Sequence, residues 1–208
     1  MKVLVACEYS GVVRDAFIKA GHDAVSCDFE PTDSPGPHYQ GDVFDLIYPR
    51  MSRITLTDNT ILRMPQWDLM IAHPPCTYLC SSGLHWNKRR PERAIKTEEA
   101  LEFVKRLLDS PIKKIALENP VGCISTRIRK PNQSIQPWMF GDDASKKTCL
   151  WTKNLPLLIP TNVITKRRYS NQTESGQNKL GPSPDRWKIR SKTYQGIADA
   201  MASQWGIQ

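Results

Sequence analysis

The sequence of 208 residues has no apolar run that approaches the roughly 18 residues a membrane-spanning helix needs. Residues 1–7 are typical of a buried strand and are too short for a secretory signal peptide. Internal repeats and low-complexity tracts are absent as well. With 39% hydrophobic and 24% charged residues, the chain has the composition of a globular protein rather than of a disordered one.

Disulfide bonds are also not expected, although the chain has six cysteines. A chain of this length buries enough apolar surface to fold without covalent cross-links. Cys7, Cys27 and Cys149 lie inside strand-like runs. We therefore predict reduced thiols and a cytoplasmic protein.

Positive charge exceeds negative charge by eight. Such a balance favours an acidic partner, of which nucleic acid is the commonest. Residues 166–192 carry eight basic residues and only two acidic ones, Glu174 and Asp185, so most of the excess lies in this segment. Charge alone does not decide between a nucleic-acid-binding segment and a solvated loop.

The first third of the chain alternates in the manner of an α/β protein. Residues 2–7 predict a strand, residues 10–20 an amphipathic helix, and residues 23–29 a second strand. A helix between two adjacent strands in so few residues implies a crossover connection and parallel strands. The other expected elements are strands over 67–72, 112–117 and 147–151, helices over 92–108 and 197–205, and loops over 30–40 and 166–192.

We therefore expect an α/β, Rossmann-like fold with a mostly parallel sheet. Residues 1–152 form its core, and residues 153–192 form a short basic excursion. Residues 193–208 contain a helix that returns to the core.

The first strand-to-helix turn, residues 7–11, suggests a nucleoside site without the full G-x-G-x-x-G pattern. Asp28 ends the second strand, a position suited to a ribose hydroxyl pair. Glu8 would repel a pyrophosphate, so adenosine without phosphates, as in S-adenosylmethionine, fits better. Asp42, after the proline-rich loop, can accept from an adenine amino group. The structural alternative is a tight turn with two ordinary turn or strand-end aspartates.

Cys76 follows a strand-like run and two prolines, so it stands at the end of a strand. The spacing of His73, Cys76, Cys80 and His85 matches no common zinc pattern. A nucleotide deaminase would show H-x-E followed by P-C-x-x-C, and neither is present. Amino-group methyltransferases place Asp or Asn before Pro-Pro and an aromatic residue after it, which this chain lacks. A nucleophilic cysteine and a buried structural thiol remain.

Glu118 favours the nucleophile. A glutamate between a buried strand and a proline is costly unless it has a partner or a task. Because Cys76 and Glu118 both end strands of a parallel sheet, we expect them to face one crevice. A thiolate beside a carboxyl that donates a proton can add to an electron-poor ring.

These residues, taken together, resemble the C5-cytosine DNA methyltransferase family. The likeness covers residues 2–120 in order. It comprises the glycine turn at 7–11, the acidic strand end at Asp28, Gly-Asp-Val at 41–43, Pro-Cys at 75–76 and Glu-Asn-Pro at 118–120. The chain also resembles the small stand-alone methylases of phages and prophages, in residues 136–141 and 194–206, which would place it in a host cytoplasm.

The resemblance implies a class I methyltransferase fold, S-adenosylmethionine as cofactor and no metal. Cys76 would attack C6 of a cytosine, which in a duplex must first be flipped out. Glu118 would protonate or hydrogen-bond N3, with Asn119 beside it. The cofactor-binding residues would be Glu8, Tyr9, Ser10, Gly11, Asp28, Phe29, Asp42, Val43 and Pro75.

The chain departs from the family at several points. Thr77 stands where the family has Gln, and Pro120 where it has Val. The arginine-rich strand appears only as residues 146–149, Lys-Lys-Thr-Cys. The target-recognition region is reduced to about residues 153–192, which can present few side chains to base edges. The predicted contacts to DNA are Lys147, Lys166, Arg167, Arg168, Arg186, Lys188 and Arg190.

Sequence patterns therefore leave the substrate open. Duplex or single-stranded DNA is the first expectation, with a protein partner or self-association supplying specificity. RNA or a free pyrimidine nucleotide is the second. A non-catalytic nucleic-acid-binding module derived from a methylase is the third.

Overall fold

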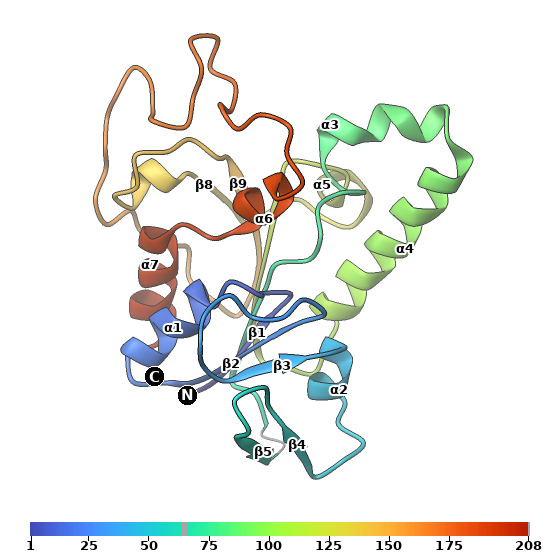
Figure 1. Cartoon of the computed structure of the whole chain (residues 1–208), viewed down its shortest axis with the longest axis vertical. Coiled ribbons are helices and arrows are strands. Elements are labelled where there is room, and N and C mark those ends of the chain that lie inside the picture. The colour runs from blue at the N-terminus through green and yellow to red at the C-terminus, as the bar shows by residue number, and fades with distance from the viewer. Residues whose placement is uncertain (64–65, 208) are drawn as a thin grey trace.

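The computed structural model describes residues 1–63 and 66–207, and within them the main sheet has seven strands (Figure 1). Five neighbouring strands are parallel, and β9 runs antiparallel between β7 and β8. The order across the sheet is β3 (His38–Gln40), β2 (Asp23–Asp28), β1 (Lys2–Ala6), β6 (Leu69–Ala72), β7 (Lys114–Pro120), β9 (Thr148–Lys153) and β8 (Gln133–Ile135). The predicted Rossmann-like α/β fold with a mostly parallel sheet is confirmed.

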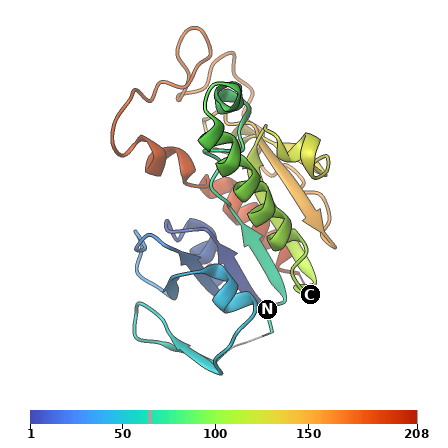
Figure 2. The ribbon, with the colours of Figure 1, turned by 90° about the vertical axis from the view of Figure 1, so that its right-hand side faces the viewer.

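Helices cover both faces of this sheet (Figures 1 and 2). A separate hairpin of β4 (Arg53–Thr55) and β5 (Ile61–Arg63) lies beside it. The helices are α1 (Val12–Lys19), α2 (Val43–Ile47), α3 (Ser81–Leu84), η1 (His85–Lys88), α4 (Pro91–Leu108), α5 (Ile124–Arg127), η2 (Pro137–Met139), α6 (Arg186–Ser191) and α7 (Gln195–Trp205). In the part of the chain that the structure describes, no helix has the length and apolar character that a membrane crossing requires.

Two apolar cores hold these layers together. On one face, Leu101, Val104 and Leu107 of α4 pack against the sheet, and on the other face α1 packs against α7 and the sheet. Phe17 and Trp205 are almost fully buried in the second core. Each large apolar side chain buried in this way stabilises the fold by about 1.5–3 kcal/mol. The apolar faces of α1, α4 and α7 thus fix these helices on the sheet.

The predicted loop over residues 30–40 needs a correction, because residues 38–40 form strand β3 at the edge of the sheet. The buried His38 ring contacts the Ser26 hydroxyl at 2.8 Å and the Glu30 carbonyl at 3.1 Å. Arg14, also buried, donates to the carbonyls of Ser34 and Pro35. These side chains hold the proline-rich segment against β2, and such long-range support leaves no periodic signal in the sequence.

The strand predicted to stop at Leu117 also differs, because β7 continues to Pro120. The antiparallel strand β9 pairs with it from Ile115 to Pro120, and Glu118 lies opposite Leu150. Glu118 is therefore inside a strand, yet it still lies beyond Ala72, the last residue of the neighbouring β6. Glu118 therefore lies beside the residues that follow β6, the segment that leads to Cys76.

The basic excursion has little regular structure apart from α6, within the described residues (Figure 1). The Tyr9 hydroxyl donates to the Lys188 carbonyl at 2.5 Å, and the Tyr9 and Trp187 rings lie 5.9 Å apart. Helix α6 is thus anchored on the first strand-to-helix turn. Of the final predicted segment, only Gln208 lies outside the described residues.

Candidate active site

The candidate site lies where three neighbouring strands of the sheet end. The order β1, β6, β7 brings Glu8, His73 and Glu118 next to one another, because Ala6 pairs with Ala72 and Ala72 with Leu117. The chain leaves β1 toward β2 on one side, and β6 and β7 lie on the other. In open α/β sheets, ligands bind outside the carboxyl ends of the strands at such a reversal.

Glu8 faces inward rather than toward a ligand. Its carboxylate accepts hydrogen bonds from the amides of Val13 at 2.7 Å and Arg14 at 3.2 Å, and only 4% of the residue is exposed. Burial raises the pKa of this carboxyl, although the facing His73 and the two amides lower it in part. Glu8 thus occupies amides in the first turn of α1, and these amides are not open to a cofactor.

Backbone geometry shapes the same turn. Cys7 has φ of 57° and Gly11 has φ of 76°, both in the left-handed region. A Cβ at Gly11 would come within 2.5 Å of the Arg14 guanidinium, so the tight turn needs glycine there. Tyr9 points toward α6, and Ser10 donates to Glu8 at 3.3 Å. These four positions, 8–11, form a turn at the border of the site and do not line the neighbouring pocket.

A pocket of about 320 Å³ opens beside this turn. Of the predicted cofactor residues, Asp28, Phe29, Asp42, Val43 and Pro75 line it. The remaining lining comes from Cys7, Cys27, Gly41, Pro74, Tyr78, Lys96, Glu99, Ala100 and Phe103. Four of these residues, from Lys96 to Phe103, belong to α4, the helix predicted over 92–108. Their spacing in the sequence does not indicate that they line a pocket rather than pack in the core.

The polar groups of this pocket suit adenosine. Asp28 accepts from the Glu30 amide at 3.0 Å through one oxygen, and burial raises the pKa of its carboxyl. Asp42 caps α2 by accepting from the Phe44 amide at 2.9 Å through Oδ1. Each carboxyl has a second oxygen that can accept from a ribose hydroxyl or an adenine amino group. Apolar walls around a few acceptors fit a nucleoside without phosphates.

Cys76 lies on a tight turn just after the two prolines. The amides of Leu79 and Cys80 both donate to the Cys76 carbonyl at 3.0 Å. This turn is fastened to the end of β7, where the Asn119 amide nitrogen donates to the Pro74 carbonyl at 2.7 Å. The Cys123 amide also donates to the Leu79 carbonyl at 2.8 Å. The turn that carries Cys76 is therefore fastened to β7 and to the segment that follows it.

The thiol of Cys76 has Cys80 as its neighbour. A hydrogen bond between the two sulfurs, followed by burial and the charge of Glu118, raises the pKa of Cys76. The same hydrogen bond lowers the pKa of Cys80, with further help from Ser82, whose hydroxyl lies 3.2 Å from the Cys80 sulfur. The Cys80 sulfur therefore ionises more readily than the Cys76 sulfur.

Glu118 is held as a carboxylate. Burial alone would raise its pKa, but the hydrogen bond with His73 and the charge of Lys146 outweigh this effect and lower the pKa. His73 Nδ1 lies 3.1 Å from Glu118 Oε2, and the two side chains are 8% and 13% exposed. The charge of Glu118 also raises the pKa of the Cys76 thiol, and that both groups face one crevice stays a prediction.

Two participants were missed from the sequence. In the sequence, His73 was weighed as a zinc ligand. Its position after a strand does not by itself predict a contact with Glu118, which lies 45 residues further along the chain. Lys146 precedes β9 and acts on Glu118, whereas the predicted Lys147 is exposed. Alternation of side chains along the edge of β9 could have distinguished the two lysines.

Part of the predicted basic surface is neutralised within the protein. Lys166 pairs with Asp143 at 2.6 Å, and Arg168 lies 3.6 Å from Glu174. Lys188 lies 3.8 Å from Glu30. The other predicted contacts in this segment, Arg167, Arg186 and Arg190, have no such acidic partner among the described residues.

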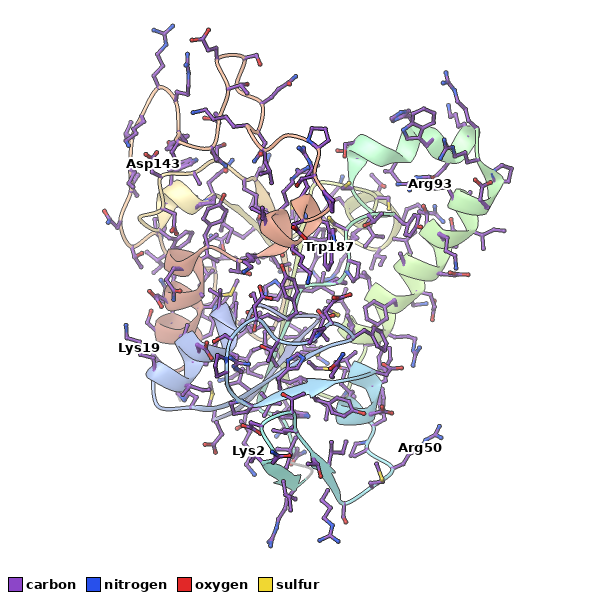
Figure 3. The ribbon with its side chains drawn as sticks, in the orientation of Figure 1. Lys2, Lys19, Arg50, Arg93, Asp143 and Trp187 are labelled. Atoms are coloured by element: carbon purple, nitrogen blue, oxygen red, sulfur yellow. The ribbon has the colours of Figure 1, made fainter. Side chains whose placement is uncertain are left out.

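A second cationic surface, absent from the sequence predictions, begins directly after the Cys76 turn. The guanidinium carbons of Arg89 and Arg90 lie 5.7 Å and 5.1 Å from the centre of the Trp86 ring, which is 39% exposed. Arg93 donates to the Thr77 carbonyl at 2.6 Å. Figure 3 shows Arg93 at the upper right, on α4, and Trp187 near the centre of the molecule, on α6. In the sequence, the cluster of basic residues within 88–93 is the feature that could have predicted this surface.

Comparison with known proteins finds no family model and no curated protein that matches this chain. Among solved structures, the chain is similar to a prophage protein of E. coli named for DNA modification methyltransferase activity, with 12% sequence identity and a TM-score of 0.44. The likeness covers 79% of this chain and 52% of that protein, so the chain spans about half its length. A likeness of this degree defines neither family nor activity.

Proposed function

We propose that this protein transfers a methyl group to C5 of cytosine in DNA through a covalent bond to Cys76. The observation that carries the proposal is a half-buried Cys76 thiol on a turn that Asn119 fastens to the end of β7, the strand of the largely buried Glu118 carboxylate, beside a pocket suited to adenosine. Any one of these three features also occurs in proteins that transfer no methyl group. Together they provide a nucleophile, a proton-transferring group and a place for a methyl donor.

The pocket residues Asp28 and Asp42 would hold the ribose and the adenine. Phe29 and Phe103 provide apolar surface to the same ligand. When bound, S-adenosylmethionine supplies an electrophilic methyl group on a sulfonium, which departs as a neutral thioether. Pro74 and Pro75 line the pocket and lead directly to Cys76, so the methyl donor and the nucleophile would be adjacent.

In the proposed reaction, the Cys76 proton passes to the Cys80 sulfur and the Cys76 sulfur bonds to C6 of cytosine. The electrons of the C5=C6 bond move toward N3, which gains a proton through Glu118. C5 then takes the methyl group. Loss of the C5 proton to water and departure of the Cys76 sulfur restore the ring, and the N3 proton returns through Glu118.

In this proposal, Asn119 holds the segment that carries Cys76 in place. Its amide nitrogen donates to the Pro74 carbonyl, and its Oδ1 has no partner among the described residues.

DNA would be held by the two cationic surfaces, the excursion around α6 and the segment that contains Trp86. Neither presents many side chains to base edges, so a short recognition site, single-stranded DNA or a specificity-giving partner fits this chain best.

The test combines methyl transfer with covalent trapping. The protein is incubated with methyl-labelled S-adenosylmethionine and duplex DNA, single-stranded DNA, RNA or free deoxycytidine nucleotides. A DNA with 5-fluorocytosine is the trap, because fluorine at C5 cannot leave as a cation and the base stays joined to Cys76. We expect label in DNA and a denaturation-resistant adduct, both lost in Cys76→Ala and both kept in the matched control Cys149→Ala.

Three other outcomes would each overturn part of the proposal. Incorporation that survives Cys76→Ala would show that the mechanism is not covalent through this residue. Label in RNA or free nucleotides alone would overturn the DNA assignment. Salt-sensitive binding to nucleic acid without any incorporation would leave a binding module in place of an enzyme.

A further inference from the structure

His73 stands between two buried carboxyl groups. Its Nδ1 lies 3.1 Å from Glu118 Oε2, and Glu8, on the next strand of the sheet, interacts with its charge from the other side. Its Nε2 is buried and has no hydrogen-bond partner among the described residues. A buried imidazole without a partner for one nitrogen is costly unless the ring has a task.

Cys76 and Glu118 by themselves do not supply the proton that N3 needs. Glu118 rests as a carboxylate, because His73 and Lys146 lower its pKa. A carboxylate can accept a hydrogen bond but has no proton to give to N3. The thiol pair is no substitute, since the proton of Cys76 moves to Cys80 when the sulfur attacks. The proton that reaches N3 must therefore first reach Glu118.

We propose that His73 is the positioning residue that stores this proton as an imidazolium and passes it to Glu118 as the Cys76 sulfur adds to C6. This inference rests on the proposed function and names a further participant in it. On attack, the Nδ1–H bond breaks and its proton goes to the Glu118 carboxylate, and N3 then takes this same proton from Glu118, which returns to its carboxylate form. The ring becomes neutral imidazole, and the sequence reverses when the Cys76 sulfur leaves. No proton is gained or lost by the pair over one cycle.

The neighbouring charges suit such a store. Glu8 and Glu118 lie on the two sides of the ring, and the 3.1 Å contact between His73 Nδ1 and Glu118 Oε2 gives the stored proton a direct path to that carboxylate. Lys146, which comes from the segment before β9, offsets part of the negative charge at Glu118. Arg14 does the same for Glu8. The proposed imidazolium thus lies between two carboxylates, and Arg14 and Lys146 offset part of the negative charge of these carboxylates.

The test measures the rate at which the protein forms the 5-fluorocytosine adduct in a single turnover between pH 5.5 and 8. His73→Asn is the main variant, because its amide can replace the Nδ1 donor but cannot hold an additional proton. His73→Gln serves as a second variant if the first fails to fold. His22→Gln is the matched control, since His22 precedes β2 at the opposite end of the sheet. Binding of S-adenosylmethionine by calorimetry checks that each variant is folded.

We expect His73→Asn to slow adduct formation about 100-fold at pH 7.5, the lower range for loss of general acid catalysis. The ratio of the unmutated rate to the His73→Asn rate should fall by about tenfold for each unit that the pH falls, because solvent then protonates Glu118 directly. Glu8, Lys146 and the Cys76–Cys80 pair are present in both proteins, so their effects cancel in the ratio of the two rates.

A second readout asks whether His73 acts through Glu118. Glu118→Gln places a permanent donor at N3, so adding His73→Asn to it should change the rate less than about threefold, an interaction of the kind that double-mutant cycles detect. An equal loss in both backgrounds, or a deficit that does not vary with pH, would mean that His73 has only a structural role. If the unmutated protein forms no adduct at any pH, the proposed function fails and this inference with it.

Discussion

Asn119 offers the sharpest test of how the site is assembled. It is 1% exposed, and among the described residues its side chain makes one hydrogen bond, from its amide nitrogen to the Pro74 carbonyl at 2.7 Å. This bond joins the end of β7 to the segment that carries Cys76. Asn119→Ala would leave the Pro74 carbonyl without its donor in a place that water reaches poorly.

The expected cost follows from that geometry. A buried acceptor that loses its partner costs about 1–3 kcal/mol. For a protein of this size, each 1 kcal/mol lowers Tm by about 2–4 °C, so we expect Tm to fall by about 4–8 °C for a mid-range loss. Asn119→Asp should cost more, because a carboxylate oxygen would then face the Pro74 carbonyl oxygen beside the charge of Glu118.

Urea denaturation measures the free energy of unfolding, and the 5-fluorocytosine adduct measures the position of Cys76. Both should change in Asn119→Ala. Gln204→Ala is the matched control, because Gln204 also donates from its amide to a backbone carbonyl, at 2.8 Å, but on the surface. We expect the control to lose less than about 1 kcal/mol and to form the adduct normally. An Asn119→Ala protein with unchanged stability and adduct rate would refute the reasoning.

Four further results are expected. Cys80 should be alkylated by iodoacetamide even at pH 6.5, where an ordinary thiol is only about 1% thiolate, because its pKa is lowered; equal labelling of all accessible cysteines would contradict this. Gly122→Ala should lower both Tm and the adduct rate, because a Cβ there would collide with the backbone of the Cys76 turn; a neutral effect in urea denaturation would contradict the packing. Asp28→Asn should weaken S-adenosylmethionine binding by about 1.5–3 kcal/mol in calorimetry, and an unchanged affinity would remove Asp28 from the pocket's ligand set. Replacing Arg89 and Arg90 with Ala should lower the salt dependence of DNA binding by about two counterions, and an unchanged slope would show that this surface does not touch phosphates.

Local patterns were enough to predict the elements that frame the site. The apolar run of β1, the helix that follows it and the return as β2 have periodicities that need no distant partner, and they were found within one or two residues. Helix α4 likewise begins at Pro91, one residue before the predicted start, and ends at Leu108 as predicted. The positions of Asp28 and Asp42 at the ends of elements, and therefore in the pocket, followed from the same patterns.

What the sequence alone determined is thus the fold class and the presence of a thiol and a carboxyl near one edge of a parallel sheet. Only the tertiary structure decided how these groups are connected. Glu8 turns inward because the amides of α1 capture it, β7 extends past Leu117 because β9 pairs with it, and His73 contacts Glu118 because their strands are neighbours. These outcomes depend on hydrogen bonds and charges between residues far apart in the chain, which the spacing of residues along one strand or helix does not encode.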